Sequence, residues 1–196
     1  MIIKQLTLHN FGVYAGTNTF EFFQKKPIVL IGGMNGRGKT TFLEAILIAL
    51  YGSNSIAYKE SKFQSYNQYL RSFVNWEDWS QSCYVELAFV LNENSHDVYL
   101  IRRSWNALSK ITKESINVWQ NGVESDFLTK NWSMFVENIL PSALSGFFFF
   151  DGEKIAELAV DDSNKQIKES IRAMLGLTVL DVLKNDLGRS IRRTSR

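Results

Sequence analysis

The stretch that decides the fold is residues 28–41, which read IVLIGGMNGRGKTT. It contains the pattern G-x-x-x-x-G-K-[S/T] of a phosphate-binding loop, at Gly33, Gly38, Lys39 and Thr40. The apolar run 28–31 ahead of the loop predicts a buried strand, and residues 42–51, which Gly52 closes, predict an amphipathic helix. Because the motif requires a strand, a glycine loop and a helix in this order, the stretch predicts a P-loop α/β fold.

The residue types in the loop suit phosphate chemistry. Glycines let the backbone wrap closely around phosphates, and the backbone N–H groups then point inward at the positive end of the helix dipole. Lys39 adds a point charge for the outer phosphates, and the Thr40 hydroxyl is a hard oxygen ligand for Mg²⁺. We therefore expect ATP, with Mg²⁺, to contact Gly33, Met34, Asn35, Gly36, Arg37, Gly38, Lys39, Thr40 and Thr41. The alternative is a glycine-rich turn without a ligand.

Two residues of the loop have a second interpretation. The Asn35 amide can reach the terminal phosphate or the attacking water, but asparagine also tolerates the left-handed backbone of a tight loop. Arg37 is expected to point to solvent although it lies close to the phosphates.

A second candidate site lies at residues 147–153, which read FFFFDGE. The four phenylalanines predict a short buried strand with Asp151 at its carboxyl end. In a self-contained P-loop enzyme this is a Walker B strand, with Asp151 holding Mg²⁺ through water and Glu153 near the nucleophile. In a split enzyme it is an accessory loop, and in the simplest alternative Asp151 caps a helix over residues 153–158. Lys39 and Asp151 are the predicted catalytic residues, and Thr40 and Asp151 the predicted Mg²⁺ ligands.

The rest of the chain predicts a sheet with helices around it. Alternation of polar and apolar residues predicts strands over 3–10, 17–23, 82–91, 98–105 and 115–119. The last three are expected to be antiparallel, with a turn at Asn121-Gly122. Loop and short helix are expected over 53–81, and helices over 127–140, 153–158, 166–175 and from 179 onward. In the last of these, Leu180, Leu183, Leu187 and Ile191 have the spacing of a coiled-coil seam or an amphipathic helix.

Composition limits the class of protein. The chain has 196 residues, of which 45% are apolar, so it can bury a core and is not a disordered tail. A net charge of +2 does not demand nucleic acid, so Arg102-Arg103 and the tail arginines remain open as DNA contacts or as solvated charges. The single cysteine, Cys83, fits a reducing cytosol, and no apolar run approaches the roughly 20 residues of a membrane-spanning helix.

Three segments together carry a family resemblance: Ile2 to Phe11, Ile28 to Tyr51 and Phe147 to Leu158. They resemble the N-terminal half of an SMC-like ABC ATPase head followed by its coiled-coil arm. FFDGEKI at 149–155 and GGMNGRGKTT at 32–41 look most like the DndD-type ATPases of bacterial DNA phosphorothioate modification. The resemblance implies a mixed sheet plus an antiparallel sheet, an N-terminal lobe over residues 1–176, and a coiled-coil arm that starts at 177–196.

The resemblance also implies roles and partners. Residues 147–153 occupy the Q-loop position, where such heads usually have glutamine, so Asp151 inherits the role of a metal ligand. An arginine common after Asn-Phe in these heads is Gly12 here. The Leu-Ser-Gly-Gly signature and a strand ending in Asp-Glu are missing, which implies that the full protein supplies them beyond the arm. The implied partners are DNA, proteins of the DNA sulfur-modification system, and a second copy in a head-to-head dimer.

Three functions remain open at this level. The first is the ATP-binding part of a DNA-modifying ATPase, nearly inactive as an isolated chain. The second is a stand-alone P-loop nucleotidase or kinase that uses Asp151 as Walker B. The third is a non-catalytic, nucleotide-gated assembly module. The antiparallel pattern of residues 82–119 counts against the second, because such kinases alternate parallel strands with helices.

Overall fold

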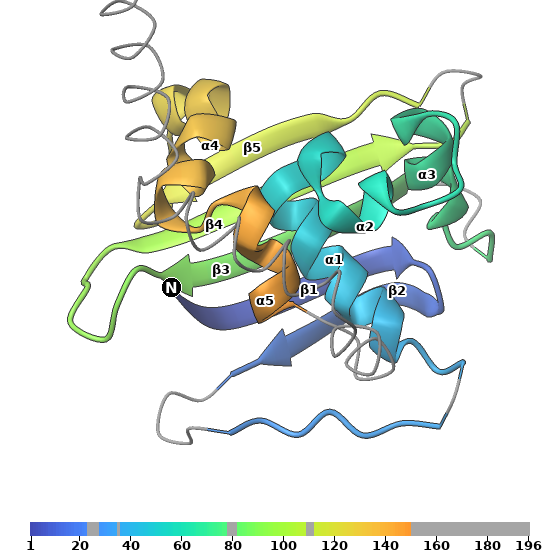
Figure 1. Cartoon of the computed structure of the whole chain (residues 1–196), viewed down its shortest axis with the longest axis horizontal. Coiled ribbons are helices and arrows are strands. Elements are labelled where there is room, and N and C mark those ends of the chain that lie inside the picture. Colours follow the sequence, from blue (N-terminus) through green and yellow to red (C-terminus); the bar gives the residue numbers. More distant parts are fainter. Residues whose placement is uncertain (23–27, 35, 78–81, 109–111, 150–196) are drawn as a thin grey trace, which may run out of the picture. The chain divides into compact units, whose positions relative to one another are not determined.

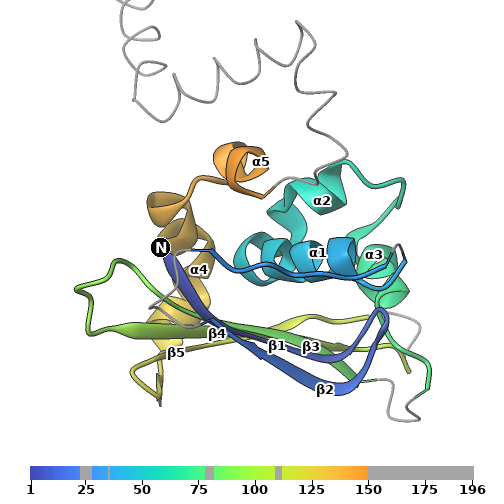
Figure 2. The same cartoon turned by 90° about the horizontal axis from the view of Figure 1, so that it is seen from below.

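A computed structural model of the chain describes residues 1–22, 28–34, 36–77, 82–108 and 112–149. The chain divides into two compact units, Met1–Ser145 and Gly146–Arg196. In the first unit, one sheet carries helices α1 to α4 on one face, and none of these four helices covers its other face (Figures 1 and 2). This arrangement confirms the mixed class of helices and strands.

The sheet has six strands in the order β2-β1-β3-β4-β5-β6. Their bounds are β1 Ile2–Phe11, β2 Tyr14–Glu21, β3 Ser82–Val90, β4 Val98–Asn106, β5 Ser115–Gln120 and β6 Val123–Glu124. Every ladder between these strands is antiparallel, as predicted for the later three. The predicted turn between β5 and β6 is also confirmed, because Asn121 and Gly122 have positive φ angles of 54° and 79°, as a tight hairpin turn requires.

The described helices, except the last of them, occur where the sequence predicts helix or short helix. Their bounds are α1 Lys39–Tyr51, α2 Ile56–Lys59, α3 Tyr66–Ser72, α4 Asp126–Ile139 and α5 Ser145–Phe148, with 3₁₀ turns at Gly52–Asn54 and Ser142–Leu144. α1 is not the amphipathic helix expected. Its residues from Ala45 to Tyr51 are all buried, because β3, β4 and α4 all contact it.

The core lies between the helices and the covered face of the sheet. Leu6, Leu87, Ile101 and Val118 face one another in register across β1, β3, β4 and β5, and each is 0% exposed. Burying a leucine or isoleucine contributes about 1.5–3 kcal/mol, so this row is a major source of the stability of the sheet. Cys83 also lies in this core, as expected, at 1% exposure.

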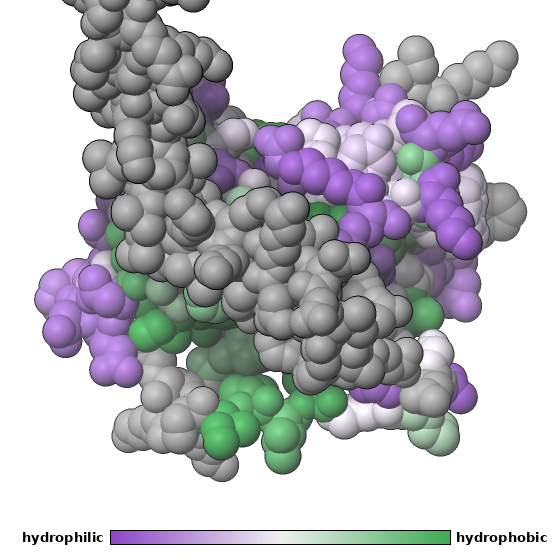
Figure 3. All heavy atoms as spheres, viewed as in Figure 1, coloured by the Kyte–Doolittle hydropathy of each residue, from purple (hydrophilic) through white to green (hydrophobic). Residues whose placement is uncertain are grey.

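The predicted buried strand at residues 28–31 is wrong for this structure. The segment forms no strand, and Ile28, Val29, Leu30 and Ile31 are 72%, 51%, 91% and 47% exposed. Figure 3 shows apolar surface at the lower edge, where this segment runs in Figure 1. A buried strand of this kind needs partner strands and cover on both faces, and none of the six described strands pairs with it.

The predicted strand at residues 147–150 is also wrong over its described part. Residues 145–148 form the short helix α5 instead. A short apolar run does not distinguish a strand from a helical segment by periodicity, and here the preceding 3₁₀ turn at Ser142–Leu144 continues directly into helix. Asp151, Glu153, the helices predicted after them and the coiled-coil arm lie outside the described residues.

Candidate phosphate-binding site

The glycine loop leads directly into the first turn of α1. Gly38 is the N-cap residue, with φ 94° and ψ 11°, and Gly36 has φ 76°. Both are left-handed conformations that glycine adopts without steric cost. Gly38 has no side chain to cap the helix, and the first turn contains no acidic residue. No side chain of the first turn therefore competes with a phosphate group for the N–H groups at this terminus. The backbone here therefore fits a phosphate ligand.

Lys39 reaches back across the loop. Its Nζ donates hydrogen bonds to the carbonyl oxygens of Gly33, at 2.5 Å, and of Met34, at 3.2 Å. Lys39 itself is exposed. Its ammonium group can therefore leave these carbonyl acceptors and bind phosphate oxygens without any change in buried structure. The contact of Lys39 with the outer phosphates stays a prediction.

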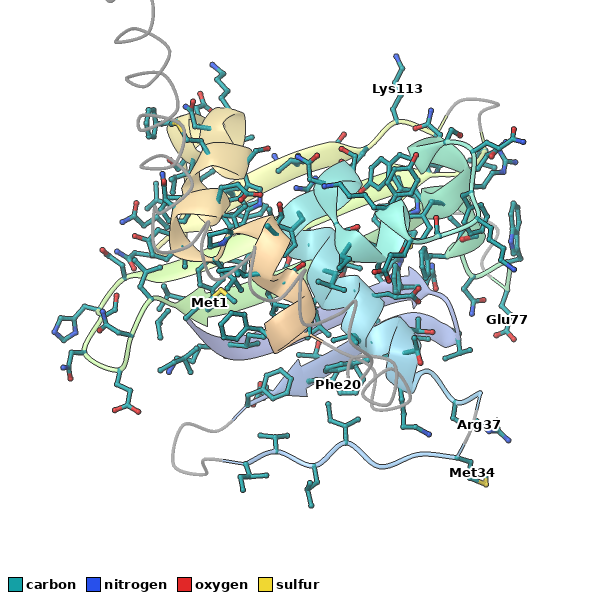
Figure 4. All side chains as sticks on the ribbon, viewed as in Figure 1. Met1, Phe20, Met34, Arg37, Glu77 and Lys113 are labelled. Carbon is teal, nitrogen blue, oxygen red and sulfur yellow. The ribbon has the colours of Figure 1, made fainter. Side chains whose placement is uncertain are left out.

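The other predicted ATP contacts lie in the same loop and in the first turn of α1. Gly33, Met34, Gly36, Arg37 and Thr40 are exposed, and Thr41 is half-buried in the first turn of α1. Arg37 lies at the outer corner of the loop beside Met34, away from the sheet, in line with its expected exposure to solvent (Figure 4). Asn35 lies outside the described residues, so both interpretations of it stay predictions.

The predicted Mg²⁺ site is only half described. Thr40 lies in the first turn of α1, whereas Asp151 lies outside the described residues, so their meeting stays a prediction. Within the part of the chain that the structure describes, no group of three His, Cys, Asp or Glu residues could hold a metal ion. A threonine hydroxyl together with phosphate oxygens and water is nevertheless a donor set that suits Mg²⁺.

The turn between β1 and β2 also touches the phosphate loop, which the sequence did not reveal. The Tyr14 hydroxyl donates a hydrogen bond of 3.1 Å to the carbonyl of Gly38. Gly12 packs against Thr41 so closely that a Cβ on Gly12 would lie 2.6 Å from Thr41 Cγ2. The only sequence signal was the Asn10-Phe11-Gly12 turn itself. A side chain at position 12 would therefore collide with Thr41 of α1.

Arg102 and Arg103 are not a pair of DNA-facing charges. Arg103 is 3% exposed and donates from Nε to the carbonyl of Ala49 at 3.0 Å. Arg102, on the opposite face of β4, pairs with Glu86 at 2.6 Å and lies over the rings of Tyr84 and Trp119. Successive strand residues point to opposite faces, so adjacent arginines cannot form one patch.

The fold and the site together define a class of protein. A buried helix that begins at a G-x-x-x-x-G-K-[S/T] loop, with the lysine folded over that loop, is the nucleotide-binding element of a P-loop ATPase lobe. Residues 5–187 match the family described as AAA domain, and the chain belongs to this family. Its architecture is that of a Rad50-like N-terminal ATPase lobe.

The chain is similar in sequence to three known proteins. A stretch of 48 residues, 24% of this chain and 5% of the relative, is 52% identical to the C subunit of the SbcCD nuclease of Treponema pallidum. The chain is 30% identical over 198 residues to the DNA double-strand break repair Rad50 ATPase of Archaeoglobus fulgidus, covering 100% of this chain and 19% of that protein. The Rad50 ATPase of Pyrococcus abyssi is 26% identical over 192 residues, which are 96% of this chain and 20% of the relative.

The chain thus spans about a fifth or less of the length of these relatives. The similarity supports the SMC-like ABC ATPase class that the sequence motifs indicated. Within the described ranges, no helix is both long and apolar enough to cross a membrane.

Proposed function

We propose that this chain is the ATP-binding N-terminal part of an SMC-like ATPase that couples ATP binding and hydrolysis to work on DNA. The observation that carries the proposal is the geometry at the start of α1. Gly38 is left-handed, the first helical turn lacks acidic residues, and Lys39 donates to the loop carbonyls of Gly33 and Met34. Each of these features favours a bound polyphosphate.

The residues have distinct roles in this proposal. The backbone N–H groups at the start of α1 hold the inner phosphates, and Lys39 neutralises charge on the outer ones. The Thr40 hydroxyl and the Asp151 carboxylate hold Mg²⁺, which when bound neutralises the charge that develops on the phosphates during transfer. Glu153 and Asn35 are the residues that the sequence offers for orienting the attacking water.

The exposed segment at residues 28–31 supports the proposal that protein outside this lobe completes the ATPase head. Four consecutive apolar residues with exposures from 47% to 91% leave an apolar surface that water solvates poorly. A strand supplied by the C-terminal half of the protein would pair with this segment and bury it. We propose that the same half supplies the missing signature and the Asp-Glu strand, and that two heads then close around ATP.

The pathway in which this ATPase works is a separate part of the proposal. The likeness of residues 149–155 to DndD-type ATPases favours DNA phosphorothioate modification, with the proteins of that system as partners. The names of the matched relatives refer to DNA double-strand break repair and to a nuclease, which favours the processing of DNA ends. Loss of sulfur from genomic DNA in a strain carrying Lys39→Ala supports the first pathway, whereas sensitivity to DNA breaks with unchanged sulfur content supports the second.

Calorimetry of the chain with Mg-ATP tests nucleotide binding. Lys39→Ala is expected to abolish binding while leaving the fold intact, because Lys39 and the two residues whose carbonyls it bonds, Gly33 and Met34, are all exposed. Lys130→Ala, at an exposed position on α4, is the matched control and should bind like the wild type. Unchanged affinity in a folded Lys39→Ala variant would reject the phosphate site.

A phosphate-release assay then separates the split head from the stand-alone enzyme. The isolated chain should hydrolyse ATP hardly at all, and adding the C-terminal half should restore a rate that rises more steeply than linearly with protein concentration. Robust turnover by the isolated chain, linear in its concentration and dependent on Lys39, would instead identify a nucleotidase or kinase. Binding without hydrolysis after the missing half is restored would identify a nucleotide-gated assembly module.

A further inference from the structure

The turn between β1 and β2 is fixed from the side of α3. The Gly12 N–H donates to the carbonyl of Phe73 at 2.6 Å, and Asn75 Nδ2 donates to the carbonyl of Gly12 at 2.9 Å. The backbone N–H of Asn75 also donates to the carbonyl of Asn10 at 2.8 Å. These bonds hold the turn as a rigid extension of the sheet.

The same turn contacts the phosphate loop from the other side. The carbonyl of Gly38 accepts two hydrogen bonds, one of 3.1 Å from the Tyr14 hydroxyl and one of 2.8 Å from the backbone N–H of Phe42. A Cβ added to Gly38 would lie 2.6 Å from Val13 Cγ2 and 2.9 Å from the Tyr14 hydroxyl. The residue immediately before Lys39 is therefore held against Tyr14 on one side and by its own helix on the other.

We propose that Tyr14 is a positioning residue that fixes the orientation of the peptide between Gly38 and Lys39, and thereby prepares the loop for phosphate. This inference rests on the proposed nucleotide binding. The carbonyl of Gly38 and the N–H of Lys39 belong to one planar trans peptide, so a bond that fixes the carbonyl direction fixes the opposite direction of the N–H. Glycine at a left-handed φ has many alternative conformations, and the Tyr14 bond selects one of them.

The ring of Tyr14 is held independently of its hydroxyl. It packs edge-on against Phe20, with ring centres 5.7 Å apart, and Phe20 packs edge-on against Phe42 of α1 at 5.1 Å. Figure 4 shows Phe20 between β2 and the start of α1. Burial raises the pKa of Tyr14, so its hydroxyl keeps its proton and remains a donor. Tyr14→Phe should therefore remove the hydrogen bond while leaving the packing in place.

The chain offers a matched control at the other end of the same helix. The Tyr51 hydroxyl, at the last residue of α1, donates to the carbonyl of Leu140 at 2.9 Å. Tyr51→Phe also deletes one hydroxyl-to-carbonyl bond, but far along α1 from the phosphate loop. A purely structural role for Tyr14 predicts similar losses of thermal stability in both variants and no loss of nucleotide affinity in either.

Two measurements test the inference. Tyr14→Phe should weaken Mg-ATP binding by about 3- to 10-fold in calorimetry, the effect of one hydrogen bond, whereas Tyr51→Phe should not. In the nucleotide-free protein, amide hydrogen exchange at Phe42, whose N–H bonds to the Gly38 carbonyl, should be faster in Tyr14→Phe and unchanged in Tyr51→Phe.

Unchanged affinity and exchange in Tyr14→Phe, or equal effects of the two variants, would overturn the positioning role. If the wild-type chain binds no Mg-ATP, the proposed function fails, but the exchange rate of the Phe42 amide still decides whether Tyr14 fixes the Gly38 carbonyl.

Discussion

Arg103 and Glu114 form a salt bridge beneath the helices, with Arg103 Nη1 2.9 Å from Glu114 Oε2 and side-chain exposures of 4% and 16%. The pair connects three parts of the lobe. Arg103 Nε donates to the carbonyl of Ala49 near the end of α1, and Glu114 Oε1 accepts from the Tyr66 hydroxyl of α3 at 2.8 Å. A positive charge at the C-terminus of α1 is also favourable for the helix dipole. The guanidinium lies where a side chain at Gly52 would be, since a Cβ there would be 2.5 Å from Arg103 Nη1.

Arg103→Met should therefore destabilise the lobe strongly. Removing one partner of a buried pair leaves the other uncompensated and costs about 3–5 kcal/mol. Arg102→Met is the matched control one residue earlier, because the Arg102 side chain is 41% exposed in its pair with Glu86 and should cost about 1 kcal/mol or less. Urea denaturation of the two variants checks this, and equal losses of stability would contradict the assignment of Arg103 to the core.

Gly12→Ala should disturb the phosphate loop as well as the turn. Gly12 has φ +58°, and its added Cβ would meet Thr41 Cγ2 at 2.6 Å, whereas Gly16, in the same hairpin, has φ +65° with nothing within 4 Å. Gly16→Ala should cost only backbone strain, of about 1–2 kcal/mol. Gly12→Ala should be less stable than Gly16→Ala and bind Mg-ATP more weakly. Calorimetry and thermal melts of both variants test this. Identical affinities for Mg-ATP would mean that the turn does not influence nucleotide binding at the start of α1.

Stability should fall as the pH rises above about 8.5. Burial raises the pKa of the Cys83 thiol, so the folded chain keeps a proton that the unfolded chain releases near its ordinary pKa of about 8.5. The unfolded state then binds fewer protons, and the free energy of unfolding decreases with pH by up to about 1.4 kcal/mol per unit for this one group. The phenols of Tyr51, Tyr66 and Tyr69, whose pKa values are also raised by burial, act in the same direction above about pH 10.

Cys83→Ala isolates the thiol in this pH dependence. The difference in urea midpoint between the wild type and Cys83→Ala should be constant up to about pH 8 and shrink between about pH 8.5 and 10. The thiol should also resist a disulfide reagent until the chain is unfolded, because it is 1% exposed. A fast native-state reaction, or parallel pH curves for the two proteins, would contradict the burial of Cys83 in β3.

Leu30→Lys should leave the stability of this lobe unchanged but impair its assembly with the C-terminal half. Leu30 is 91% exposed, so the substitution should change the free energy of unfolding of the isolated chain by no more than about 0.5 kcal/mol. If the C-terminal half covers residues 28–31, the buried lysine should strongly reduce the ATPase activity regained when that half is added. Val123→Lys, at a 71% exposed position on β6, is the control. Equal regained activity in the two variants would show that assembly leaves Leu30 in water.

The antiparallel sheet could be predicted from the sequence because its signals are local. Alternation along β3, β4 and β5 and the Asn121-Gly122 turn fix each strand and its neighbour with contacts close in sequence. The start of α1 could be predicted for the same reason, since glycines and Lys39 act through the backbone next to them. The strand at residues 28–31 could not, because an apolar run forms a strand only where partner strands exist.

By itself, then, the sequence predicted the glycine loop before α1, the helix that follows it and the strands β1 to β5. Only the tertiary structure decided which side chains surround that loop. Tyr14 reaches Gly38 because β1 and β2 fold back beneath α1, and Arg103 is buried rather than exposed because β4 pairs between β3 and β5 under the same helix. A motif specifies neighbours along the chain, whereas these contacts join residues 24 and 54 positions apart, and only packing brings such residues together.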